Sequence, residues 1–367
     1  MEPFFLELKQ IFKEHGRIAA RHDKTISIAT YAARRAYLAR ELYRLRTGKL
    51  LKMENGKLVP ERRFEIPSPY GLKRKHIEAL IADWLVRDLS TAYLHNLLSM
   101  LRVFAGWIGK PNLVPATAEI VPDPKHKRRQ QVATRDLSWS GAGVDVAEKL
   151  RDIAAADRYV AMVLDLMRVY ALRLKEASLL RPHLADQVVY LDIGRGTKGG
   201  RDRMHKITTP EEREVLDRAK ALVQDRAACL IPRGTSYRSW QNHVYYILKK
   251  HGVTHKAIGT SSHGLRHEGL NDLYEKIAGA PSPVRGGKPG EVDPETDRFA
   301  RAQVAETAGH SRPRISSAYL GGVLRRQKHH GEIPNPPPTA ESTHGNADAQ
   351  PLAAADGDTT SLAVELS

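Results

Sequence analysis

The 367-residue chain contains very little cysteine and no long apolar run. Its single cysteine, Cys229, cannot form an internal disulfide or a cysteine-rich zinc site, which fits a reducing compartment. No apolar segment approaches the roughly 20 residues that a membrane-spanning helix needs. Residues 1–12 include two glutamates and lack the basic start and cleavage site of a secretory signal. We therefore expect a cytoplasmic protein with no membrane partner.

Acidic residues are outnumbered by basic ones, 42 to 58, and the net charge is +16. Residues 331–367 hold six acidic residues and no Lys or Arg, so residues 1–330 alone carry a net charge of +22. Lysine and arginine gain affinity for polyanions by displacing counterions from phosphates, so this charge favours a nucleic acid partner. The alternative is a surface charge that only keeps the protein soluble.

The first third of the chain shows apolar residues at helical spacing. The pattern predicts helices over 31–46, 72–86 and 91–107, with Ser90 as the N-cap of the last. Apolar stripes of this kind usually face a core, while the arginines and lysines between them face outward. We expect residues 1–112 to form a helical domain with a basic face.

Residues 113–140 break the helical pattern with prolines and a basic run. They are predicted to form a linker between two domains. The basic run is either an ordinary solvated segment or a contact along a phosphate backbone, and the sequence favours neither. Its candidate phosphate contacts are Lys125, Lys127, Arg128 and Arg129.

Residues 141–330 are predicted to form a second, mostly helical domain with a small sheet. The one clear strand signal is a hairpin of 188–191 and 204–207 around a glycine-rich turn. Helices are expected over 144–170, 211–228 and 237–251, and from about residue 262. Residues 331–367 lack the apolar content to offset their ordering entropy, so we expect a disordered acidic tail. The fold class is thus mainly α, of the α+β type.

Four separate segments of the second domain each place a basic group where it could hold a phosphate, and the last adds a tyrosine. They are Leu172-Arg173-Leu174-Lys175-Glu176, Gly196-Thr197-Lys198-Gly199, His263-Gly264-Leu265-Arg266 and Gly309-His310, with Tyr319 nine residues beyond that histidine. Each segment alone is common in proteins. Together and in this order, they resemble the active site of tyrosine recombinases of the phage integrase type. The resemblance covers residues 145–325.

The resemblance implies six catalytic residues and a transesterification that needs no metal and no cofactor. Tyr319 attacks a phosphodiester, leaves a 3′-phosphotyrosyl link and frees a 5′ hydroxyl, which later reverses the step. Arg173 and Arg266 hold the nonbridging oxygens, because planar guanidinium groups pair with phosphate oxygens better than lysine does. The alternative for each arginine is an ordinary salt bridge on a helix surface.

The remaining roles follow the same resemblance. His263 lies three residues before Arg266 on one helix face, with Ser261 or Ser262 as its cap, and would donate a hydrogen bond or carry the tyrosine's proton. His310 would bind the phosphate just after Gly309, a predicted helix C-cap, with Pro313 starting the next helix. The alternative for both histidines is that they lie at helix ends and have no part in the reaction. No pair of histidines has a zinc-type spacing backed by Cys or carboxylates, so we expect no metal.

The glycine-rich hairpin supplies Lys198 as the implied general acid for the leaving 5′ oxygen. Arg195, Arg201 and Arg203 beside it are candidate contacts to the DNA backbone. Glu176 either orients one of the arginines or forms a plain helix ion pair.

Two features depart from the family pattern. Ala171 stands where a glycine often precedes Leu-Arg, and 44 residues separate Arg266 from His310 where roughly two dozen are usual. The extra length falls in a segment rich in proline and glycine, residues 281–294, which we interpret as a surface insertion.

The resemblance further implies double-stranded DNA with specific recombination sites as the partner, a homotetramer on that DNA, and accessory DNA-bending or directionality proteins. It places the protein with the bacterial nucleoid and predicts integration or excision of a mobile element. The rivals are a type IB topoisomerase, a noncatalytic DNA-binding regulator of the same fold, and an RNA-binding protein, which the lack of aromatic clusters on strands disfavours.

Overall fold

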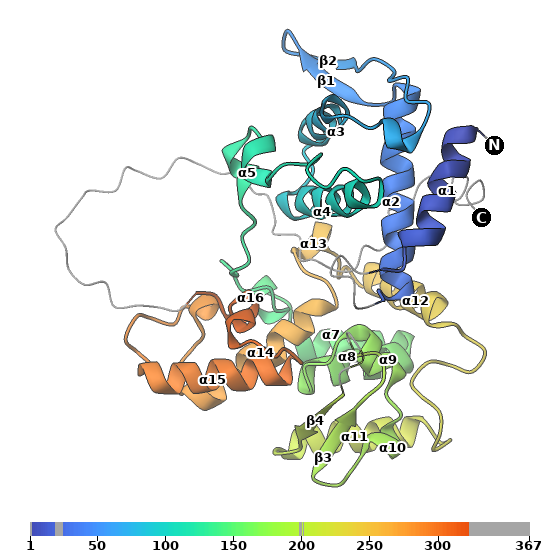
Figure 1. The fold of residues 1–367 in the computed structure, drawn as a ribbon. Coiled ribbons are helices and arrows are strands. Elements are labelled where there is room, and N and C mark those ends of the chain that lie inside the picture. Colours follow the sequence, from blue (N-terminus) through green and yellow to red (C-terminus); the bar gives the residue numbers. More distant parts are fainter. Residues whose placement is uncertain (1, 19–24, 198–199, 201, 323–367) are drawn as a thin grey trace, which may run out of the picture. The chain divides into compact units, whose positions relative to one another are not determined.

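The computed structural model describes residues 2–18, 25–197, 200 and 202–322, and this part of the chain forms two compact units that divide between Arg129 and Gln130 (Figure 1). Both units are built from helices and carry one antiparallel hairpin each. The expected fold class, mainly α with small sheets, is confirmed. Within the described ranges, none of the helices has the length and apolar character to cross a bilayer.

The first unit packs four long helices around one core. They are α1 (Pro3–His15), α2 (Ile28–Thr47), α3 (Arg74–Val86) and α4 (Thr91–Trp107), and shorter helices are η1 (Pro69–Gly71), α5 (Thr117–Ile120) and α6 (Pro124–Lys127). The core includes Leu42, Leu80, Trp84 and Leu98, all completely buried. Ser90 caps α4 as expected, because its side chain accepts a hydrogen bond from Tyr93 N.

A hairpin that the sequence analysis missed joins α2 to α3. Its strands are β1 (Leu51–Glu54) and β2 (Lys57–Pro60), and Glu54 pairs with Lys57. Asn55 and Gly56 form the turn with φ of 51° and 75°. An Asn-Gly pair with both φ positive is the preferred two-residue hairpin turn, so this dipeptide was the available signal.

Residues 113–140, predicted to be a linker, contribute buried side chains to both units. Val114, Ile120 and Val121 belong to the core of the first unit. Trp139 is completely buried in the core of the second unit, where its indole N–H donates to Ser261 O at 2.8 Å. Apolar residues that are widely spaced among prolines carry no periodic signal, although the tertiary structure buries them.

The second unit places a bundle of helices beside the hairpin of β3 (Tyr190–Ile193) and β4 (Arg203–Lys206). Its helices are η2 (Ser140–Ala142), α7 (Val146–Ala156), α8 (Arg158–Val169), α9 (Leu174–Leu179), α10 (Pro182–Ala185), α11 (Pro210–Leu222), α12 (Tyr237–Lys250), α13 (His255–Ile258), α14 (His263–Ala278), η3 (Pro283–Arg285), α15 (Pro294–Thr307), η4 (Pro313–Ser316) and α16 (Ser317–Leu320). The expected hairpin is therefore present.

The single helix expected over 144–170 is in fact two helices. Asp157 adopts an extended backbone (φ −155°, ψ 105°) and its carboxylate accepts hydrogen bonds from Tyr159 N and Val160 N. An aspartate that caps the next helix interrupts a pattern whose apolar spacing continues across the break. The buried face of α8 then supports α14, and Gly269 of α14 lies so close to α8 that a Cβ there would lie 2.1 Å from Arg168 O.

A separate small core joins α14, α15 and α16 (Figure 1). It contains Leu270, Tyr274 and Val304 together with Tyr319 and Leu320. The helix that carries Tyr319 is therefore held by packing against two longer helices.

Candidate active site

Tyr319 is almost buried, with 7% of its surface exposed, and it faces three histidines. The ring centroid of Tyr319 lies 6.2 Å from that of His263, 5.0 Å from that of His267 and 6.4 Å from that of His310. His263 is the first residue of α14, and His310 follows α15 directly after Gly309. The structure thus brings Tyr319, His263 and His310 together from three separate segments.

Arg266 lies beneath the tyrosine and is completely buried. Its Nε donates to Tyr319 Oη at 3.4 Å, its Nη2 donates to Ala308 O at 2.6 Å, and its Nη1 donates to Ala171 O. Ala171 has a φ of +49°, in the left-handed region. Glycine adopts this backbone without strain, which explains the glycine usual at this position, and alanine adopts it at a cost of about 1–2 kcal/mol.

Arg173 reaches the same carbonyl as Arg266. It precedes α9 as the N-cap residue, and its Nη2 donates to Ala308 O at 2.9 Å. One backbone oxygen therefore fixes both guanidinium groups side by side. Burial lowers the pKa of Arg173, as does the neighbouring positive charge of Arg266. Two cations held together under partial burial form a site that favours an anion.

Glu176 joins three arginines and is completely buried. Its carboxylate accepts from Arg173 Nη1 at 2.6 Å and from Arg203 Nη1 and Nη2 at 3.0 and 2.9 Å, and it lies 3.8 Å from Arg266 Nη1. Burial alone would raise the pKa of Glu176, but the hydrogen bonds and charge of Arg203, with the charges of Arg173 and Arg266, lower it to about 2. The structure therefore favours the role in which Glu176 orients arginines.

Arg203 does not lie on the surface as a backbone contact would. Its side chain is mostly buried against Glu176 through two parallel hydrogen bonds. Side chains alternate between the two faces of β4, and Arg203 points inward, toward Glu176 of α9. Arg195 is exposed in the turn after β3, whereas Lys198 and Arg201 lie outside the described residues.

The basic run of the first unit has a mixed exposure. Lys125 and Arg128 are exposed, while Lys127 and Arg129 are half-buried, at and just after α6. Lys125 Nζ lies 3.7 Å from Asp88 Oδ1.

His267 and Asn271 also contact Tyr319, although the sequence motifs did not identify them. Among the three histidines around Tyr319, His267 lies nearest to the ring, and Asn271 Nδ2 donates to Tyr319 O at 3.5 Å. His267 lies four residues after His263 and Asn271 lies eight residues after it, so all three share one face of α14. This i, i+4, i+8 spacing was the signal that could have identified them. In the described part of the chain, no group of three His, Cys, Asp or Glu residues is arranged to hold a metal ion.

Two protein-family models match the sequence. A model described as integrase matches residues 135–269, and one described as the N-terminal part of phage integrases matches residues 56–114. Together they span 194 of 367 residues. The chain belongs to the tyrosine recombinase family. The integrase match ends before His310 and Tyr319. The assignment of those two residues to the active site of this recombinase therefore depends on their spacing and geometry.

Solved structures share the recombinase fold at low sequence identity. Lambda integrase residues 75–356, a dimer bound to a COC′ core site, has a TM-score of 0.52 at 16% identity and covers 89% of this chain and 98% of its own. A lambda integrase tetramer bound to a Holliday junction has a TM-score of 0.51 at 16% identity, with coverage of 90% and 79%. The Tn1549 transposon integrase in complex with circular intermediate DNA has a TM-score of 0.50 at 13% identity, with coverage of 86% and 96%. No curated protein matches the chain.

The role of Glu176 in this recombinase is testable through stability. Glu176→Gln is expected to lower the free energy of unfolding at pH 7 by about 3–5 kcal/mol, because it leaves buried arginines without a counterion. The folded-state pKa is depressed, so the stabilisation is fully present above pH 4.5 and is lost as the pH falls toward 2. Chemical denaturation of the wild type and Glu176→Gln between pH 7 and pH 3 measures the difference in their free energies of unfolding. This difference should become smaller as the pH falls.

Glu211→Gln is the matched control, because Glu211 accepts from Arg168 at the same 2.6 Å but its side chain is 58% exposed. An exposed pair contributes about 0–1 kcal/mol. Equal effects of the two substitutions would contradict the assigned role of Glu176.

Proposed function

We propose that the protein is a site-specific DNA recombinase that cuts and rejoins double-stranded DNA through a covalent link to Tyr319. The observation that carries this proposal is the hydrogen bond from Arg266 Nε to Tyr319 Oη, within a cluster that also contains Arg173, His263 and His310. A phenol is a weak nucleophile near neutral pH, and neighbouring cations and a base are what activate it.

In the proposed reaction, Tyr319 Oη bonds to the phosphorus as the bond from phosphorus to the 5′ oxygen breaks. The phenol's proton passes to His263, and the 5′ oxygen takes a proton as it leaves. Lys198, which lies outside the described residues, is our candidate donor of that proton. The reverse attack by a 5′ hydroxyl restores the phosphodiester and frees the tyrosine. The bond energy is retained in the phosphotyrosyl link, so the cycle requires no ATP.

Two arginines would stabilise the charge that develops on the nonbridging oxygens. The side chain of Arg173 is 21% exposed and can meet a phosphate directly. Arg266 is completely buried, and the hydroxyl of Tyr319 is bonded to its Nε. A phosphate therefore reaches Arg266 only after a neighbouring group moves, and a turn of the Tyr319 side chain toward the phosphate would uncover Nε.

The assembly is proposed from the same family relationship. Lambda integrase forms a tetramer on a Holliday junction, and we propose that this chain also acts as a homotetramer on two DNA sites during integration or excision of a mobile element. Residues 1–112 would bind DNA and residues 141–330 would carry out catalysis. The basic run, with Lys125, Lys127, Arg128 and Arg129, and the exposed Arg195 are proposed backbone contacts.

The proposal is tested with nicked duplexes that cover the DNA flanking the gene, in which the nick lets the short cleaved strand diffuse away. The wild-type protein is expected to form a denaturation-resistant adduct through the 3′ phosphate at the break, and the departing strand should carry a free 5′ hydroxyl. Because arginines supply the positive charge, the adduct should form at the same rate in excess EDTA. Denaturing gels and end-labelled strands measure both results. The absence of an adduct on every candidate site, or relaxation of supercoiled plasmids that carry none of these sites, would overturn the site-specific assignment.

A further inference from the structure

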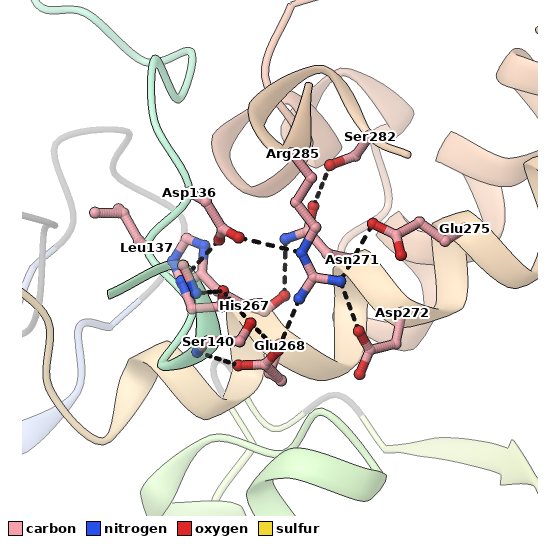
Figure 2. Close-up of polar contacts among 12 residues, drawn as sticks. Asp136, Leu137, Ser140, His267, Glu268, Asn271, Asp272, Glu275, Ser282 and Arg285 are labelled. Atoms are coloured by element: carbon pink, nitrogen blue, oxygen red, sulfur yellow. Dashed lines mark hydrogen bonds and ion pairs between the residues drawn. The ribbon is translucent and has the colours of Figure 1, made fainter. Parts of the chain in front are cut away.

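The segment between α14 and α15, interpreted from sequence as a surface insertion, is firmly anchored. Its η3 turn places Arg285 among four carboxylates (Figure 2). The side chain of Arg285 is mostly buried. Its contacts are Nε to Asp136 Oδ2 at 3.1 Å, Nη2 to Glu268 Oε1 at 2.8 Å, and Nη1 to Asp272 Oδ1 at 2.7 Å and Glu275 Oε1 at 3.2 Å. A mobile surface loop has no need of a buried arginine with four acidic partners.

A chain of buried hydrogen bonds leads from this segment to the tyrosine. Ser282 Oγ donates to Asn271 Oδ1 at 2.5 Å. Asn271 Nδ2 donates in turn to His267 O at 2.8 Å and to Tyr319 O at 3.5 Å. Ser282 and Asn271 are both completely buried, and Figure 2 shows Ser282 and Arg285 approaching α14 from the same side. The amide of Asn271 therefore couples the segment to the backbone of Tyr319.

Direct packing makes a second connection. Gly321 ends α16 with a φ of +82°, and a Cβ added there would lie 3.0 Å from Val284 Cγ1 and 3.2 Å from Pro283 Cβ. Arg301 holds the same turn through Gly321 O, to which its Nη1 donates at 3.1 Å. The end of the tyrosine helix is thus confined between η3 and α15.

We propose that residues 281–285, here named the brace, fix the position of Tyr319 relative to Arg266 and the histidines, with Arg285 and Ser282 as positioning residues. This inference rests on the proposed function of Tyr319. Arg285 holds the brace against α14. The brace in turn holds Tyr319, through Asn271, and Gly321, through direct packing. A displacement of about 1 Å at a reacting atom can cost about 100-fold in rate, so a short helix such as α16 needs support of this kind.

Two variants separate positioning from folding. Arg285→Gln leaves four carboxylates without their cation, whereas Ser282→Ala removes only one hydrogen bond and disturbs the fold less. In single-turnover reactions with the nicked duplex, both are expected to form the covalent adduct at least about tenfold more slowly, while DNA affinity stays within about twofold. Arg285→Lys should recover part of the rate, because it keeps one cation among the carboxylates. Nitration of Tyr319 by tetranitromethane, followed by mass spectrometry, should be faster in Arg285→Gln than in the wild type.

Arg218→Gln is the matched control. Arg218 pairs with Asp165 at 2.7 Å and with Glu214 at 3.6 Å, and it lies on α11, away from the tyrosine helix. It should keep the wild-type adduct rate and nitration rate. An unchanged or faster adduct rate in both brace variants, or an equal loss in Arg218→Gln, would overturn the brace.

The two proposals fail in different ways. If the wild type forms no adduct, the proposed function is wrong, and nitration still tests the brace. Faster nitration of Tyr319 in Arg285→Gln than in the wild type and Arg218→Gln supports the brace, and equal nitration in all three overturns it.

Discussion

Tyr319→Phe is expected to reduce covalent adduct formation at least about 1,000-fold, because it removes the only oxygen that could attack in the proposed step. DNA affinity should stay within about twofold of the wild type. Phenylalanine fills the same space in the small core of α14, α15 and α16, and the lost hydrogen bond to Arg266 Nε is long, at 3.4 Å. Denaturing gels of the nicked-duplex reaction measure the adduct, and fluorescence anisotropy measures the affinity.

Tyr274→Phe provides the control for this loss. Tyr274 lies in the same core and its buried hydroxyl donates to Asp297 Oδ1 at 2.7 Å, so the substitution also deletes one bonded hydroxyl. It should leave the adduct rate unchanged. A noncatalytic regulator of the same fold predicts instead that Tyr319→Phe and Tyr274→Phe behave alike.

Arg173→Lys is expected to slow adduct formation by about 100–1,000-fold with little change in DNA affinity. Lysine keeps the charge but cannot bond Ala308 O, Glu176 and a phosphate oxygen at once, because it lacks the planar fork. The loss of one preorganised donor to a developing oxyanion typically costs a factor of this size. Single-turnover kinetics at saturating protein isolate the chemical step.

Arg168→Lys is the comparison variant for Arg173→Lys. Arg168 is exposed to a similar extent, 24% of its side chain, and also bonds carboxylates, those of Asp165 and Glu211. It lies on α8, outside the cluster around Tyr319. If both lysine variants retain rates within about threefold of the wild type, Arg173 has no direct role in the reaction.

Three members of the candidate catalytic set were accessible from sequence because they lie at the ends of helices, where local motifs are strong. Arg173 is the N-cap of α9, His263 begins α14, and His310 follows the left-handed Gly309. Motifs of this kind fix the spacing of residues within one segment, but they do not predict which other segments it contacts. The acceptor that Arg173 and Arg266 share, Ala308 O, is a backbone atom, and no pattern of side chains predicts it.

Contacts between distant segments account for most of what the sequence analysis missed. Arg203 reaches Glu176 across 27 residues, and Arg285 reaches Asp136 across 149. Proline and glycine around residues 281–294 indicated irregular backbone correctly, but they gave no sign that Ser282 is buried or that Arg285 contacts four carboxylates. The break at Asp157 was also missed, because the apolar periodicity continues across this N-cap and so does not reveal that one helix ends and another begins.

The central claim is that Tyr319 is the residue that becomes joined to DNA, and peptide mapping of the adduct tests it most directly. The adduct formed on a nicked duplex is digested with nuclease and trypsin and sequenced by mass spectrometry. The expected result is the tryptic peptide of residues 315–325 carrying a phosphonucleotide on Tyr319. A nucleotide attached to any other residue, or recovery of this peptide entirely unmodified from a proven adduct, would contradict the account.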